Sequence, residues 1–175
     1  MPELPTEPQT VRSHTRIGRW LHWGTTALLF YGFVRNGEIT DPLNNPEAMQ
    51  TEVLFAIGLG ALFVWRFVFM RLANGGSTRL PATAPRWERF ASHTVHLGTY
   101  LGVAAIILTG LAIALTSSTG GFPLSVAFAA HDGSVFVTAL LIVIHIAGAL
   151  WHWLIRRDGV WQAMTGRYTQ NTAAN

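Results

Sequence analysis

The stretch LIVIHIAGALWHWLIRRDG, residues 141–159, is almost wholly apolar, yet it holds His145 and His152 seven positions apart. At about 100° per residue, seven steps fall within roughly 20° of two full turns, so both imidazoles would project from one helix face, about 10 Å apart. His131 precedes His145 by fourteen positions and lies within roughly 40° of the same face, about 21 Å away along the axis. The sequence therefore predicts a helix that carries a row of histidines.

The composition indicates that much of the chain is surrounded by lipid rather than water. Of the 175 residues, 50% are hydrophobic and only 12% are charged, and the mean hydropathy is +0.31. The net charge of +3 is too small and too dispersed to indicate a nucleic-acid partner. Because the chain has no cysteine, iron–sulfur clusters, thiolate metal sites and c-type haem attachment are excluded, and any metal or cofactor must be held by histidine.

Four apolar windows stand out, at residues 17–35, 52–71, 91–116 and 132–155. Each has nearly the number of residues, about 20, that a helix needs to cross roughly 30 Å of hydrocarbon. Segments rich in glycine, proline and polar residues separate the windows. We therefore expect residues 1–175 to form a single all-α domain, an integral membrane four-helix bundle in contact with the lipid bilayer.

Arginines accumulate at one end of each predicted span. By the positive-inside rule, this end faces the cytoplasm, which places both the N- and the C-terminus and the segment between the second and third spans there. The loops on the opposite side carry Arg35 alone. The arginines at the predicted cytoplasmic ends are Arg12, Arg16, Arg19, Arg71, Arg79, Arg86, Arg89, Arg156, Arg157 and Arg167.

The histidines fall at two depths in this arrangement. His22, His93, His96 and His145 lie toward the inner ends of the spans, whereas His131 lies at the outer start of the fourth. A single histidine on an apolar face is more often a packing residue, but ionisable groups in spans are costly, so several at one depth indicate a binding site. Zinc sites usually add carboxylate or thiolate ligands, and no HExxH spacing is present. Two histidines from facing helices suit the iron of a b-type haem.

Three segments resemble the histidine motifs of the bacterial cytochrome b561 family, four-helix di-haem membrane proteins that include superoxide:quinone oxidoreductases. They are RIGRWLHW (16–23), SHTVHLGTYL (92–101) and HDGSVFVTALLIVIHIAGALWHW (131–153), and the resemblance extends over about residues 14–167. The spacing of fourteen between two histidines of the last helix is also similar to that in the b-type cytochrome subunits of formate dehydrogenase and nickel–iron hydrogenase. The resemblance implies a multi-pass protein of the bacterial inner membrane.

The resemblance implies His22 and His145 as the axial ligands of an inner haem, and His131 as one ligand of an outer haem. The family's second outer ligand is a histidine at the outer start of the second helix, where this sequence has Glu52. Three alternatives stay open: Glu52 binds the outer iron, no outer haem is bound, or the ligand comes from elsewhere, including a partner subunit. Glu52 is equally consistent with an interfacial carboxylate at the positive end of a helix dipole.

Further polar residues accompany these ligands. Arg66, inside the second span, is expected either to bind a haem propionate or to extend to the inner interface. The resemblance also matches His96 and His152 to family histidines, and we expect both to form hydrogen bonds with a quinone and to supply its protons.

The function implied by the resemblance is electron transport by a b-type cytochrome between a donor and the quinone pool, as in superoxide:ubiquinone oxidoreductases. Haem b would be the cofactor, in one copy or two, and ubiquinone the substrate. The alternative is a non-catalytic or electron-relay membrane subunit of a larger respiratory or photosynthetic complex. Whether the chain is itself an enzyme, what its electron donor is and how many haems it binds stay open at this point.

Overall fold

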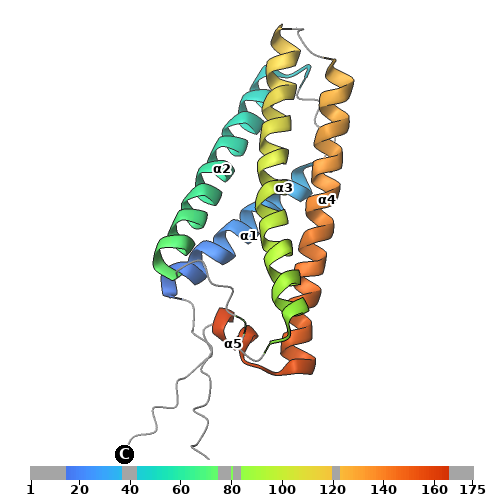
Figure 1. Ribbon diagram of the computed structural model, residues 1–175. Helices are drawn as coiled ribbons and strands as arrows, with labels where there is room; N and C mark the ends of the chain where they lie inside the picture. The colour runs from blue at the N-terminus through green and yellow to red at the C-terminus, as the bar shows by residue number, and fades with distance from the viewer. Residues whose placement is uncertain (1–14, 37–42, 75–79, 81–83, 120–122, 166–175) are drawn as a thin grey trace, which may run out of the picture.

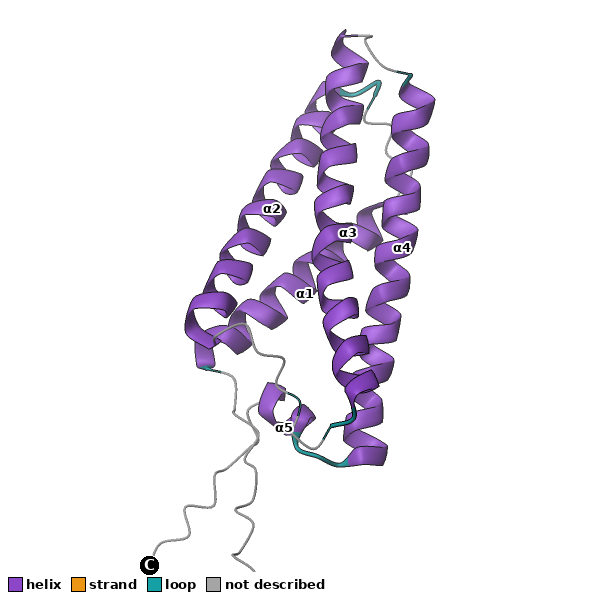
Figure 2. Cartoon of the chain, in the orientation of Figure 1, coloured by secondary structure: helices purple, strands orange, loops and turns teal. Residues whose placement is uncertain are grey.

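Four long helices and a short terminal one make up the part of the chain that the structure describes, with no strand among these residues (Figure 1, Figure 2). The structure is a computed structural model, and it describes residues 15–36, 43–74, 80, 84–119 and 123–165. The all-α prediction is confirmed. The elements are α1 (Arg16–Asn36), α2 (Pro46–Asn74), α3 (Arg86–Thr119), α4 (Leu124–Trp151), the π-helical turn η1 (His152–Arg156) and α5 (Val160–Thr165).

Three of the four predicted spans lie in helices that are long and apolar enough to cross a membrane. The predicted span at 17–35 coincides with α1, which has 21 residues, but Arg19 and His22 lower its hydropathy. In Figure 1, α1 is also the helix that runs obliquely across the others. A fourth span, the cytoplasmic location of both termini and the single domain stay predictions. The spans supported are Pro46–Leu72, Arg86–Thr119 and Leu124–Arg156.

Side-chain caps fix where the first two helices begin. Thr15 Oγ1 accepts a hydrogen bond from the backbone N–H of Gly18 at 3.1 Å. Asn45 Oδ1 accepts from the backbone N–H groups of Glu47 and Ala48 at 3.1 and 3.2 Å. The first N–H groups of a helix have no partner within the helix, so these caps satisfy donors that would be costly to bury in lipid.

Helices α3 and α4 lie side by side along most of their length (Figure 1). Small residues allow this approach, because a Cβ atom at Gly102 would collide with Thr138 Oγ1, and one at Gly98 would lie 3.0 Å from Leu141. Thr138 and Val103 are completely or almost completely buried at this contact. Close backbone approach through small residues is the usual way for membrane helices to gain packing energy, so α3 and α4 form the rigid pair against which the other helices are placed.

Helices α1 and α2 pack on this pair through an apolar cluster at mid-height. Leu29 of α1, Leu59 and Phe63 of α2, and Val103 of α3 are its buried members. Toward the lower end of the molecule in Figure 1, α2 diverges from α3. The cluster therefore joins the three helices near their middle, and the space between the helices at either end is not part of this apolar core.

The chain reverses direction after α4. The turn η1 leads into Arg157, a non-glycine residue with a left-handed backbone (φ 50°), and Gly159 has a φ of 82°. These two conformations turn the chain so that α5 folds back beneath the lower end of the molecule (Figure 1). Trp153 and Trp161 stack with ring centroids 5.3 Å apart, which holds α5 against the end of α4.

Candidate functional site

A cavity with a volume of about 590 Å³ lies at the end of the molecule that is lower in Figure 1. We call it the inner cavity, because the helix ends around it carry the arginines that predict the cytoplasmic side. Residues from α1, α2, α3, α4 and α5 all contribute to its walls. Most of the wall is apolar. Its histidine and arginine residues are His22, Arg66, Arg71, His93, His96, His145 and His152.

Three of these imidazoles meet inside the inner cavity. The ring centroids of His22 and His145 are 6.4 Å apart with an interplanar angle of 60°, and those of His96 and His145 are 4.9 Å apart at 83°. The structure thus brings together side chains from α1, α3 and α4 that lie up to 123 residues apart in sequence. Among the described residues, no group of three or more histidine, cysteine or acidic residues is arranged to hold a bare metal ion.

Arg66 of α2 extends into this cluster rather than toward the helix end. Its Nη2 lies 2.9 Å from Nδ1 of His22, its Nη1 donates to Thr25 Oγ1 at 3.3 Å, and the guanidinium lies 5.8 Å from the Tyr100 ring centroid. Because a guanidinium can only donate hydrogen bonds, Nδ1 of His22 must accept in this arrangement. The Arg66 Nε is buried without a hydrogen-bond partner, and no ion pair joins Arg66 to a carboxylate within the described part of the chain.

His96 is oriented by the backbone of its own helix. Its Nδ1 lies 2.6 Å from the carbonyl oxygen of Ser92. A carbonyl only accepts, so Nδ1 carries the proton and Nε2 of the neutral ring is left as an acceptor. His96 is therefore held in one tautomer beside His145.

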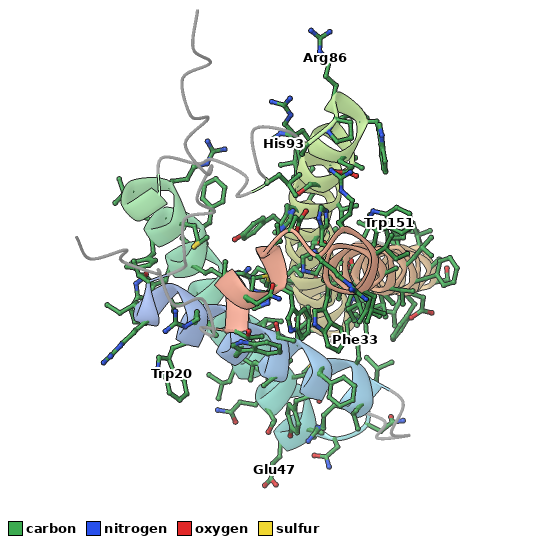
Figure 3. The ribbon with its side chains drawn as sticks, turned by 90° about the horizontal axis from the view of Figure 1, so that it is seen from below. Trp20, Phe33, Glu47, Arg86, His93 and Trp151 are labelled. Carbon is green, nitrogen blue, oxygen red and sulfur yellow. The ribbon has the colours of Figure 1, made fainter. Side chains whose placement is uncertain are left out.

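At the α5 side of the inner cavity, a histidine is paired with a carboxylate. His152 Nδ1 lies 2.6 Å from Asp158 Oδ2, and the two side chains are 12% and 13% exposed. Asp158 Oδ1 also accepts from the backbone N–H of Val160 at 3.3 Å. Seen from below, α5 lies across the centre of this end of the molecule (Figure 3), and its residues Val160, Ala163 and Met164 line the cavity.

The smaller cavity, of about 300 Å³, lies between α1, α2, α3 and α4 at the opposite end, and we call it the outer cavity. Arg35 Nη2 and Glu52 Oε1 form an ion pair of 2.7 Å across it, joining α1 to α2, and both side chains are partly exposed. His131 of α4 also lines this cavity, as does the thioether of Met49. The structure thus brings both residues predicted for the outer site, Glu52 and His131, to one cavity, where Glu52 has an arginine partner.

The tautomer of His131 follows from its neighbour Thr109. The Thr109 hydroxyl donates its single proton to the carbonyl of Ala105 at 2.6 Å and lies 3.0 Å from His131 Nδ1. The hydroxyl oxygen therefore accepts from His131 Nδ1–H, and Nε2 of the neutral ring carries no proton.

Sequence reasoning missed two of these partners. Asp158 is marked only by the RRDG segment, in which an acidic residue beside glycine indicates a turn but not its contact with His152. Arg35 offered a clearer signal, since it is the only arginine on the predicted outer side, and an isolated cation there requires a nearby anion. His93 lines the inner cavity, and His14 lies outside the described residues.

Comparisons with known proteins identify one family. A model of prokaryotic cytochrome b561 matches residues 13–167. No curated protein and no solved structure matches the chain. The family match includes all four long helices, both cavities and α5, and cytochromes of this b type hold haem b and take part in electron transfer. The chain belongs to the prokaryotic cytochrome b561 family.

Proposed function

We propose that this membrane cytochrome binds haem b in the inner cavity through His22 and His145 and moves electrons between a donor and a membrane quinone. The observation that carries the proposal is the convergence of these two imidazoles, from α1 and α4, in a cavity of about 590 Å³. Haem supplies the one-electron chemistry when bound, and the protein supplies ligands, orientation and electrostatics.

The spacing of the rings favours His22 and His145 as the ligand pair. If two imidazoles held one iron between them with metal–nitrogen bonds of about 2 Å, their ring centres would lie roughly 6 Å apart. The His22–His145 separation of 6.4 Å agrees with this value, whereas the His96–His145 separation of 4.9 Å is too short. His96 is therefore the spare imidazole of the cluster.

The buried positive charge of Arg66 supports the same assignment. A buried guanidinium with an unsatisfied Nε and no carboxylate partner among the described residues is costly unless an anion completes the site. Haem carries two propionate carboxylates, and an arginine is suited to bind one of them. Arg66 would then release His22 Nδ1, so that the proton of the neutral ring can move to Nδ1 and Nε2 can bind iron.

We expect the quinone to bind beside the remaining histidines of the inner cavity. A quinone gains two electrons and two protons as it becomes a quinol, and imidazoles are suited to donate such protons near neutral pH. His152 lies at the α5 side of the cavity with its Nδ1 bonded to Asp158, which leaves Nε2 for a quinone oxygen. Asp158 holds the ring in one orientation, as carboxylates beside catalytic histidines do. Nε2 can then accept a proton from a quinol hydroxyl, or donate one to a quinone oxygen when the imidazole carries both protons.

The test is spectroscopic and uses the purified holoprotein. Membranes and detergent-purified protein are expected to show the dithionite-reduced α-band of a low-spin b haem, and added quinol or quinone should reduce or oxidise it. His22→Ala and His145→Ala are expected to lose this band, whereas His131→Ala, on the same helix α4 as His145, serves as the matched control and should keep it. Wild-type protein without a b-type band would overturn the proposal.

A further inference from the structure

We infer that the outer cavity no longer binds haem, that the Arg35–Glu52 ion pair occupies the outer ligand position, and that electrons enter and leave this cytochrome through the inner half alone. The inference rests on the proposed function, because it assumes a haem between His22 and His145. It goes further by giving Arg35 a role and by limiting the path of the electrons.

The outer cavity is small for a haem. Both cavities lie between α1, α2, α3 and α4, and the inner one is also lined by α5 and by His152. The inner cavity, to which the proposed function assigns a haem and a quinone, has about 590 Å³, whereas the outer cavity has about 300 Å³. The outer cavity is at the lower limit for small-ligand pockets, whereas haem is a large ligand.

The carboxylate at the outer ligand position already has a partner. The Glu52 carboxylate is engaged by Arg35 at 2.7 Å, in a charge-assisted hydrogen bond of the short and strong kind. To bind iron, Glu52 would have to give up this bond, and a carboxylate is a hard ligand that competes poorly with imidazole at a haem. The ion pair instead joins α1 to α2 at the outer end, where a haem bound between helices would otherwise do so.

The described walls of the outer cavity offer few other ligands for haem iron. Among the described residues that line it, His131 and Met49 are the side chains with a nitrogen or sulfur that haem iron accepts. His131 is held by Thr109 with Nε2 unprotonated, so one ligand is retained. Met49 lines the same cavity of about 300 Å³, so a histidine–methionine haem would meet the same limit of volume as a haem bound by Glu52.

The consequence is an electron path confined to one side. His131 lies about 21 Å along the helix axis from His145, and this distance has no redox centre when the outer site is empty of haem. An electron donor on the outer face would then have no intermediate redox centre through which to reach the inner haem. The donor must therefore approach the same, arginine-rich end at which the quinone reacts.

The decisive experiment counts haem in the holoprotein as purified from membranes supplied with excess haem precursor. Pyridine haemochrome absorbance and protein mass give the haem-to-polypeptide ratio, and electron paramagnetic resonance counts the low-spin species. We expect a ratio of one and a single low-spin signal. A ratio of two overturns this inference and leaves the proposed function standing, whereas a ratio of zero overturns the proposed function itself.

Two variants locate the haem and guard against a coincidental ratio. His131→Ala and Met49→Leu are both expected to keep the ratio and the spectrum of the wild type. Loss of haem in His131→Ala would show that the outer site is the occupied one, and loss in Met49→Leu would show thioether ligation; either result overturns the inference. Because the wild-type ratio is measured without any substitution, a variant that fails to fold leaves the main test intact.

Discussion

The inner and outer cavities receive equivalent contributions from α4 and differ in what the other helices bring. His145 and His131 belong to one row on the same helix, yet His145 meets His22, His96 and the region of Arg66, whereas His131 meets Thr109. The partner position on α2 carries Glu52, bound to Arg35. A row of histidines on one helix therefore does not by itself produce two equivalent sites. Each histidine of the row can form a ligand pair only where a facing helix supplies a second imidazole.

The largest effect should come from breaking the inner pair. If His22 and His145 hold the haem iron as proposed, His22→Ala or His145→Ala removes one of its two protein ligands, and we expect complete loss of the reduced low-spin b spectrum, measured on purified protein. His96 is adjacent to His145 but too close to it to replace His22. A spectrum retained with unchanged intensity in His22→Ala would mean that His96 is a ligand and would reverse the roles of these two residues.

The next largest effect should come from rebuilding the outer pair. Glu52→His combined with Arg35→Ala supplies an imidazole opposite His131 and removes the ion pair, so we expect the haem-to-polypeptide ratio to rise above one. The added haem should disappear again when His131→Ala is included. Glu52→Gln with Arg35→Ala is the matched control, since it removes the ion pair without adding a ligand. A ratio fixed at one in the histidine variant would show that packing, and not the ion pair, closes the outer cavity.

Arg66 offers a smaller change within the inner cavity. Arg66→Leu removes the buried cation while keeping an apolar side chain, and a lost charge-assisted hydrogen bond weakens binding by roughly 10- to 100-fold. We expect weaker haem retention during purification and a lower midpoint potential, because a nearby positive charge favours the reduced form. Arg71→Leu, on the same helix and also lining the cavity, is the control and should change neither quantity to the same degree. Equal effects in both variants would argue against a specific propionate contact.

The helices and the depth of the inner histidines could be predicted from the sequence, because both depend on local patterns. Apolar windows predict helices, and the α4 row follows from the helical repeat alone. The contacts of Glu52 and Asp158 were not accessible in the same way. The Arg35–Glu52 pair depends on the oblique course of α1 (Figure 1), and the His152–Asp158 pair depends on the left-handed backbone of Arg157 and Gly159. Such contacts depend on how the helices are placed relative to one another and on single unusual dihedral angles. Neither can be predicted from the residue types alone.

The smallest effect is expected for Asp158→Asn, which should slow proton delivery to the quinone at the inner site without changing the haem. Asp158→Asn keeps the shape of the side chain and its bond to Val160 N–H, but it replaces the carboxylate oxygen beside His152 Nδ1 with an amide nitrogen, which cannot accept the Nδ1 proton. We expect an unchanged haem spectrum and ratio, with quinone-linked turnover reduced by roughly 10-fold, the size usual for partners that orient a functional histidine. The reduction should fall on kcat more than on KM, because the quinone still binds.

Controls decide whether Asp158 acts through His152 or only through the fold of α5. Asp158→Glu retains the carboxylate and should recover part of the turnover, whereas a purely structural role would make this longer side chain at least as harmful as asparagine. In a His152→Ala background, Asp158→Asn should cause little further loss, since its partner is already absent. Additive losses in the double variant would instead show that Asp158 serves the chain reversal into α5. The quinone would then have to obtain its proton from another group of the inner cavity, such as His96, whose ring centroid lies 4.9 Å from that of His145.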